Sequence, residues 1–186
     1  MKRVAIFCFA ATILAAGTAN TAEPASGEQS ARIEGRVDGA CRMGTPTAVS
    51  TNNVTVGALS QGSAEFTIDQ LVGPDGIPMS ANVVVSIPAT CTQAHVLSVS
   101  SLNDGLRTPE TVSPSSGFRN VLDYSVDIDW AGESNSFTAS GADLAAPIPD
   151  AAQGAVTVTI SLPGGGDPAI AGIYTDEIIL QLGVAG

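Results

Sequence analysis

Apolar and polar residues alternate at every second position along several stretches of the chain. The longest alternation is VLDYSVDIDW at 121–130, whose apolar face comprises Leu122, Tyr124, Val126, Ile128 and Trp130. Comparable stretches are NVTVGAL at 53–59, AEFTIDQLV at 64–72, AHVLSVSSL at 94–102, AVTVTISL at 155–162 and IYTDEIILQLGV at 173–184. This period is typical of strands with one buried and one solvated face. The stretch ANVVVSI at 81–87 is apolar on both faces, which predicts a strand at the centre of a sheet.

Turn-forming sequences separate these stretches, among them GPDG, LNDG, SPSSG, AGES and PGGGD. The best helix candidate, residues 140–155, contains Pro147 and Pro149, and proline breaks helices. Residues 140–154 are therefore expected to form a surface loop. Short strands separated by turns predict an all-β fold, an antiparallel β-sandwich.

A further alternation, SARIEGRVDGAC at 30–41, is unusually sparse on its apolar face. Ile33, Gly35, Val37 and Gly39 share that face with Cys41, and glycine weakens the interior of a strand. The opposite face carries charges of alternating sign, Arg32, Glu34, Arg36 and Asp38. Taken alone, the pattern favours a first strand of the sandwich.

The N-terminus has the features of a secretory signal peptide. Two cationic residues precede the apolar run VAIFCFAATILAAG, and TANTA then supplies small residues for cleavage after Ala19 or Ala22. The run is too short for a membrane span, and polar residues follow it. We therefore expect an exported mature protein that begins near residue 23 and has no membrane span.

Two cysteines, Cys41 and Cys91, remain after cleavage at Ala22. In an oxidising compartment an isolated pair predicts one disulfide, with two free thiols as the alternative. A zinc site is disfavoured because His95 is the only other soft ligand.

The chain is acidic, with 18 aspartates and glutamates against 7 lysines and arginines. No lysine follows the signal peptide, which excludes a lysine nucleophile and a lysine–asparagine crosslink. The charge also argues against nucleic acid and anionic membranes as partners.

No catalytic motif emerges from the residues. His95 has no second histidine to assist it, and no G-x-S-x-G elbow occurs. Asp123, Asp127 and Asp129 alternate along one strand face, whereas a calcium loop gathers its carboxylates on a tight turn. We expect no enzyme activity, no cofactor and no metal. The rival hypothesis, a secreted enzyme, would depend on His95 or on an aspartate pair in a cleft.

Several short motifs together resemble a known family. They are the pair Cys41 and Cys91, a Gly-x-Arg segment at Gly105 and Arg107, the segment Leu122, Tyr124 and Trp130, and a C-terminal block with Gly172, Tyr174 and Asp176. This combination resembles the spore coat U family, which includes subunits of archaic chaperone–usher pili. The chain differs from the family pattern in an apparent insertion at 65–80.

The resemblance implies an immunoglobulin-like sandwich, residues 41–186, that lacks one strand. A periplasmic chaperone would fill the gap until an outer-membrane usher assembles the subunits into a pilus, a surface fibre supporting adhesion and biofilm formation. The N-terminal extension of a neighbouring pilin subunit, residues 23–40, would then supply the strand, with Ile33, Gly35, Val37 and Gly39 facing the groove. A tip adhesin, or another extracellular ligand-binding or coat module, remains the alternative, with 61–80 and 140–154 as its binding loops.

Overall fold

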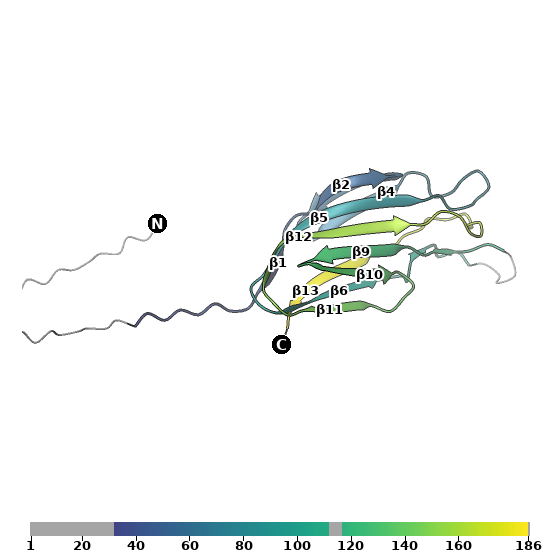
Figure 1. Ribbon diagram of the computed structural model, residues 1–186. Coiled ribbons are helices and arrows are strands. Elements are labelled where there is room, and N and C mark those ends of the chain that lie inside the picture. Colours follow the sequence, from purple (N-terminus) through teal and green to yellow (C-terminus); the bar gives the residue numbers. More distant parts are fainter. Residues whose placement is uncertain (1–31, 112–116, 186) are drawn as a thin grey trace, which may run out of the picture. The chain divides into compact units, whose positions relative to one another are not determined.

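In a computed structural model, residues 32–111 and 117–185 are described, and in that part of the chain all regular secondary structure is β-strand (Figure 1). The strands are β1 (Cys41–Met43), β2 (Thr47–Asn52), β3 (Val54–Ser60), β4 (Ser63–Ile68), β5 (Ala81–Cys91), β6 (His95–Ser101), β7 (Leu106–Arg107), β8 (Val121–Leu122), β9 (Ser125–Trp130), β10 (Glu133–Thr138), β11 (Leu144–Ile148), β12 (Ala152–Leu162) and β13 (Ile178–Val184). Within these residues no helix is long and apolar enough to cross a membrane. The predicted signal peptide lies outside the described residues.

The first layer is an antiparallel sheet centred on β5 and β12, which pair along all eleven residues of each strand. Strand β12 also pairs with β9, and β9 pairs with β10. On its other side β5 pairs with β1 near Cys91 and with β2 near its start. Strand β5 therefore occupies the central position that its two apolar faces predict.

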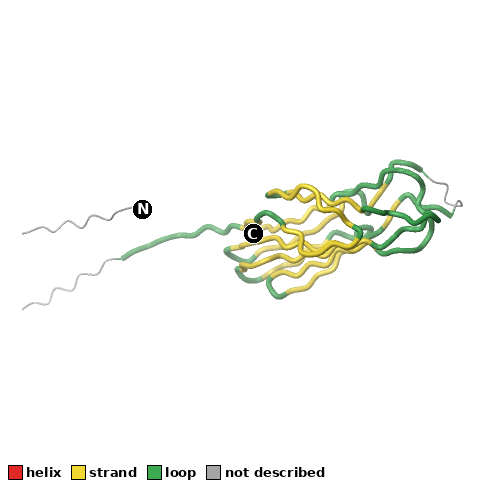
Figure 2. Tube along the Cα trace, turned by 90° about the horizontal axis from the view of Figure 1, so that it is seen from above, coloured by secondary structure: helices red, strands yellow, loops and turns green. Residues whose placement is uncertain are grey.

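The second layer contains the sheet β11–β6–β13 and the hairpin β3–β4. Between the layers lies the core, in which Leu97 and Val99 of β6 and Val126 and Val156 of the first sheet are at most 1% exposed. Figure 2 shows the strands side by side and most of the loops at the end of the sandwich away from the C-terminus. The predicted all-β antiparallel sandwich is confirmed.

The predicted faces are confirmed in the strands with the clearest alternation. In β9, Val126, Ile128 and Trp130 are buried, whereas Asp127 and Asp129 are exposed. Tyr124 is also buried, but Asp123 and Tyr124 belong to no strand, so the stretch 121–130 is interrupted.

The prediction of a surface loop at 140–154 is wrong. Leu144–Ile148 form β11, which pairs with β6, and Ala152 begins β12. Pro147 is tolerated because β11 is an edge strand. Small alanines and two prolines obscure the alternation of Ala146 and Ile148, which both face the core.

The predicted disulfide between Cys41 and Cys91 is confirmed. The two cysteines are direct cross-strand partners in β1 and β5 and close a loop with a sequence separation of 50. The bond fixes the short strand β1 to the centre of the first sheet.

We expect Cys41→Ser with Cys91→Ser to lower the free energy of unfolding by about 4 kcal/mol. The disulfide closes a long loop in the unfolded chain and lowers its entropy, and the variant loses this constraint. Urea denaturation of the variant and of the parent protein measures the difference. The native parent should show no reactive thiol, and two thiols that titrate without unfolding would contradict the bond.

The turn between β9 and β10 contains an unfavourable residue. Ala131 and Gly132 both have positive φ, 54° and 84°, as a two-residue type I′ hairpin turn requires. Glycine and asparagine adopt this conformation readily, whereas alanine does not.

Replacing Ala131 by Gly should therefore raise the free energy of unfolding by about 1 kcal/mol. Thermal denaturation measures the change. Gly132→Ala is the matched control and should destabilise by about 1 kcal/mol. A Cβ at Gly132 would meet no atom within 4 Å, so the loss of stability in Gly132→Ala reports backbone strain alone. Equal stability of all three proteins would show that the turn is unstrained.

Candidate functional site

Strand β13 has an edge without a strand partner in the described part of the chain. Along Ile178–Val184 it pairs with β6 on one side. On the other side no strand pairs with it: β1 approaches it, and β4, which pairs with β3 alone, lies across the groove described below. Unpaired edges present rows of free N–H and C=O groups and are templates for pairing with another chain.

A groove of about 840 Å³ lies beside this edge. Its floor is the inner face of the first sheet, and its lining there includes Val83 and Val85 of β5 and Ile160 of β12. Its walls are β4, with Ser63–Ile68, and the first half of β13, with Ile178 and Leu180. The site is thus apolar at its base and is bounded by two strand edges.

The apolar residues of β13 are less covered than those of its neighbour. Leu97 and Val99 of β6 are 0% and 1% exposed, since β6 has a strand on each side. Ile178, Leu180 and Leu182 point to the same core but are only half-buried. The core is therefore incompletely covered along the unpaired edge.

The second wall shows the same alternation. Ala64, Phe66 and Ile68 of β4 are half-buried, while Glu65 and Thr67 between them are exposed. The sequence predicts a strand at 64–72 and an insertion at 65–80, but it does not predict that this strand forms a wall of the groove. Its alternating pattern was visible, but not the strand that it would face.

The charged residues that line the groove are all acidic, Glu65, Asp176 and Glu177. Asp176 accepts hydrogen bonds from the hydroxyls of Ser101 and Tyr124, both at 2.6 Å. Its other oxygen accepts from the backbone N–H groups of Asn103 and Glu177, at 2.9 and 2.8 Å. The carboxylate thereby fixes the segment that leads into β13.

The environment of the Tyr124 hydroxyl changes its pKa. Burial first, and then the hydrogen bond to the Asp176 carboxylate and its charge, raise the pKa of Tyr124 well above its usual range. Burial also raises the pKa of Tyr174, whose hydroxyl bonds to the carbonyl oxygens of Arg119 and Ile170.

The other residues of the C-terminal motif position the same segment. A Cβ at Gly172 would lie 2.3 Å from the hydroxyl oxygen of Thr108, which is itself buried. Arg107 pairs through its backbone with Thr175 and donates from Nε to the carbonyl of Asn103. The C-terminal motif and the Gly-x-Arg motif thus lie together at one end of the groove.

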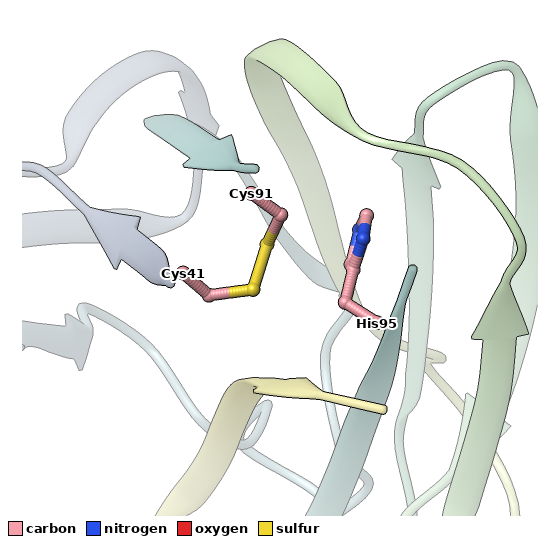
Figure 3. Close-up of side chains that lie close together, drawn as sticks. All are labelled: Cys41, Cys91 and His95. Atoms are coloured by element: carbon pink, nitrogen blue, oxygen red, sulfur yellow. A yellow bond between two sulfur atoms is a disulfide. The ribbon is translucent and has the colours of Figure 1, made fainter. Parts of the chain in front are cut away.

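His95 lies close to the disulfide, as Figure 3 shows, but it is fully buried. Its Nε2 accepts a hydrogen bond from the indole N–H of Trp130 at 2.7 Å. Its Nδ1 therefore carries the proton and donates to the carbonyl of Gln93 at 3.0 Å. One atom each of His95, Cys41 and Cys91 lie within 4.8 Å of one another, but the two sulfurs are bonded to each other and offer no thiolate.

The three aspartates considered for calcium do not converge. Asp123 accepts from the backbone and hydroxyl of Ser140, and Asp129 accepts from the hydroxyl of Ser134. Asp127 is exposed on β9. These contacts make each carboxylate part of its own strand or turn.

The four residues expected to face a groove lie before β1, in a stretch without strand structure. Ile33 and Val37 are 94% and 85% exposed. A Cβ at Gly35 would meet nothing within 4 Å, and one at Gly39 would meet only the flexible side chain of Gln93. The first-strand interpretation of 31–40 is thus not observed for residues 32–40, since β1 begins at Cys41. Their function as a donor strand stays a prediction.

Comparison with models of known families, with curated proteins and with solved structures finds no match.

The raised pKa of Tyr124 predicts a loss of stability in alkali. Above pH 10 a tyrosine of the unfolded chain ionises, whereas the native Tyr124 keeps its proton, so rising pH favours unfolding. The contribution of Tyr124 to the free energy of unfolding should be constant below pH 10 and should then fall by up to about 1.4 kcal/mol per pH unit.

Tyr124→Phe should cost about 1–3 kcal/mol at pH 8, because it removes a hydrogen bond to a carboxylate, and should flatten the alkaline slope. Urea denaturation between pH 8 and 11 measures both effects. No lysine follows the signal peptide, so Tyr174 is the other side chain that titrates in this pH range. The variant Tyr174→Phe therefore provides the comparison. An unchanged slope in Tyr124→Phe would contradict the assignment.

Proposed function

We propose that the chain is a structural subunit of an exported fibre of the chaperone–usher pilus type. In this proposal the groove is the position of a missing strand, and a neighbouring subunit supplies that strand. Binding by strand addition draws its affinity from main-chain hydrogen bonds and its specificity from alternate side chains.

The observation that carries the proposal is the unpaired edge of β13 beside half-buried apolar residues. Ile178, Leu180 and Leu182 would each gain cover from one more strand, which would pair with β13 as β6 does. Soluble proteins rarely leave an edge and an apolar surface exposed together unless a partner covers them.

The N-terminal extension supports the proposal as the donor. Ile33 and Val37 are exposed apolar residues on one face of a strand pattern and lie in a stretch without strand structure. Residues 31–39 are long enough to span the seven residues of β13. Ile33 and Val37 would occupy the groove, and Gly35 and Gly39 would lie where the two backbones approach closely.

The same geometry supports the expected partners. A subunit that exposes part of its core would aggregate unless a periplasmic chaperone covers the groove. An outer-membrane usher would then exchange the chaperone for the donor of the next subunit. The disulfide is compatible with folding in such an oxidising compartment.

Replacing Ile33 and Val37 by Asp in the full mature chain should abolish assembly but leave the subunit folded. The two carboxylates would be buried unpaired in the neighbour's groove, at a cost of several kcal/mol. Size-exclusion chromatography with light scattering measures assembly. Val49→Asp, at an exposed valine of β2 outside the groove, is the control and should assemble normally.

A peptide of residues 28–40 should bind the Ile33→Asp, Val37→Asp protein, whose own groove is intact, and the same peptide with both Asp substitutions should not. Assembly of the double variant at the rate of the parent protein would exclude these residues as the donor. If the variant instead unfolds, Ile33 and Val37 belong to the core of their own subunit.

A further inference from the structure

We infer that Glu65 and Glu177 on the walls of the groove select the incoming strand and its register by pairing with Arg32 and Arg36 of a second copy of this chain. The inference rests on the proposed function and adds to it the residues that determine specificity.

The two glutamates are placed on the outer side of the groove. Glu65 is exposed on β4 between the half-buried Ala64 and Phe66, and Glu177 is exposed directly before β13. Both line the groove, and among the described residues its lining contains no basic side chain. Asp176, the third acidic residue there, is held by four hydrogen bonds within its own subunit.

The outer face of the extension carries two arginines, of which Arg32 pairs with Glu34 of its own chain before assembly. With Ile33 and Val37 directed into the groove, Arg32 and Arg36 would point outward, beside the walls. They are two of the five arginines that follow the signal peptide in an otherwise acidic chain. Four residues of strand span about 13 Å, so the arginines would reach separate positions along the groove.

Both faces of the extension repeat every four residues, and this period penalises slips of one or two residues. The inner face reads Ile33, Gly35, Val37, Gly39, and the outer face reads Arg32, Glu34, Arg36, Asp38. A slip of one residue would exchange the faces. A slip of two would place glycines at the apolar positions and acidic side chains beside the glutamates. The wall charges therefore penalise the same misalignment as the apolar contacts do.

The acidic walls also disfavour other strands of the same chain. The outer faces of β4 and β9 carry Glu65 and the pair Asp127 and Asp129, and these faces would repel the walls. Like charges brought together across an interface suppress wrong partners, while opposite charges accelerate the correct encounter. The extension is thereby distinguished from other amphipathic strands that compete for the groove.

Full mature chains with reversed charges test this inference. At low salt, Glu65→Arg with Glu177→Arg should slow assembly about tenfold, and Arg32→Glu with Arg36→Glu should do the same. The differences should shrink in 0.5 M salt, where exposed charges are screened. Glu133→Arg with Asp150→Arg reverses two exposed acidic residues outside the groove and should assemble like the parent protein.

Mixing the two slow variants is the decisive measurement. The reversed donors fit the reversed grooves, and the unchanged donors fit the unchanged grooves, so the mixture should assemble at close to the parental rate as an alternating copolymer. The chain with all four substitutions should assemble alone, which shows that the groove variants remain folded. Glu65→Gln with Glu177→Gln should lose the salt dependence.

A groove variant that assembles at the parental rate in low salt would overturn the inference, as would a mixture no faster than its components. Either result, with normal assembly of the parent chain, leaves the proposed function standing. A parent chain that does not assemble under any of these conditions would overturn the proposed function and this inference with it.

Discussion

The free edge of β13 is the constraint on which the rest of the structure depends. A two-layer sandwich buries its core only where each layer is continuous, and here the second layer is interrupted between β13 and β4. The floor of the first sheet runs on beneath that interruption, so apolar side chains such as Ile160 remain partly exposed. Any partner must form hydrogen bonds with the backbone groups of the β13 edge and also cover the apolar surface, and an extended strand does both.

Such an edge is useful only if it is held in place without a second neighbour. The Asp176 carboxylate supplies this support, because it ties the start of β13 to Ser101 of β6 and to Tyr124 beside β9. At the other end, β13 approaches β1, which the Cys41–Cys91 bond fixes to the first sheet. The edge is therefore rigidified at both ends, which lowers the entropic cost of adding a strand.

The fold was predictable where the side-chain period is strong, and the groove was not. The alternation at Val126, Ile128 and Trp130 is enough to predict which face of the strand is buried. The isolated pair Cys41 and Cys91 is enough to predict the disulfide. Strands rich in small or polar residues, such as β2, β10 and β11, lack that signal, because cross-strand pairing rather than propensity makes them strands. The groove joins β4 to β13, more than 100 residues later, and the sequence does not say which edges stay unpaired.

In the proposed function, the sparse apolar face of residues 31–39 follows from what a donor must do. A strand that completes its own core gains stability from every large side chain, and glycines at two of four positions would be a loss. A strand that must stay exposed before assembly has the opposite requirement, since each added apolar residue promotes aggregation. In a donor strand, two anchors at Ile33 and Val37, separated by glycine and flanked by charges of alternating sign, would reconcile these demands. Solubility would then limit the hydrophobic contribution of the donor to binding, and its charged face would supply specificity that further apolar residues would not.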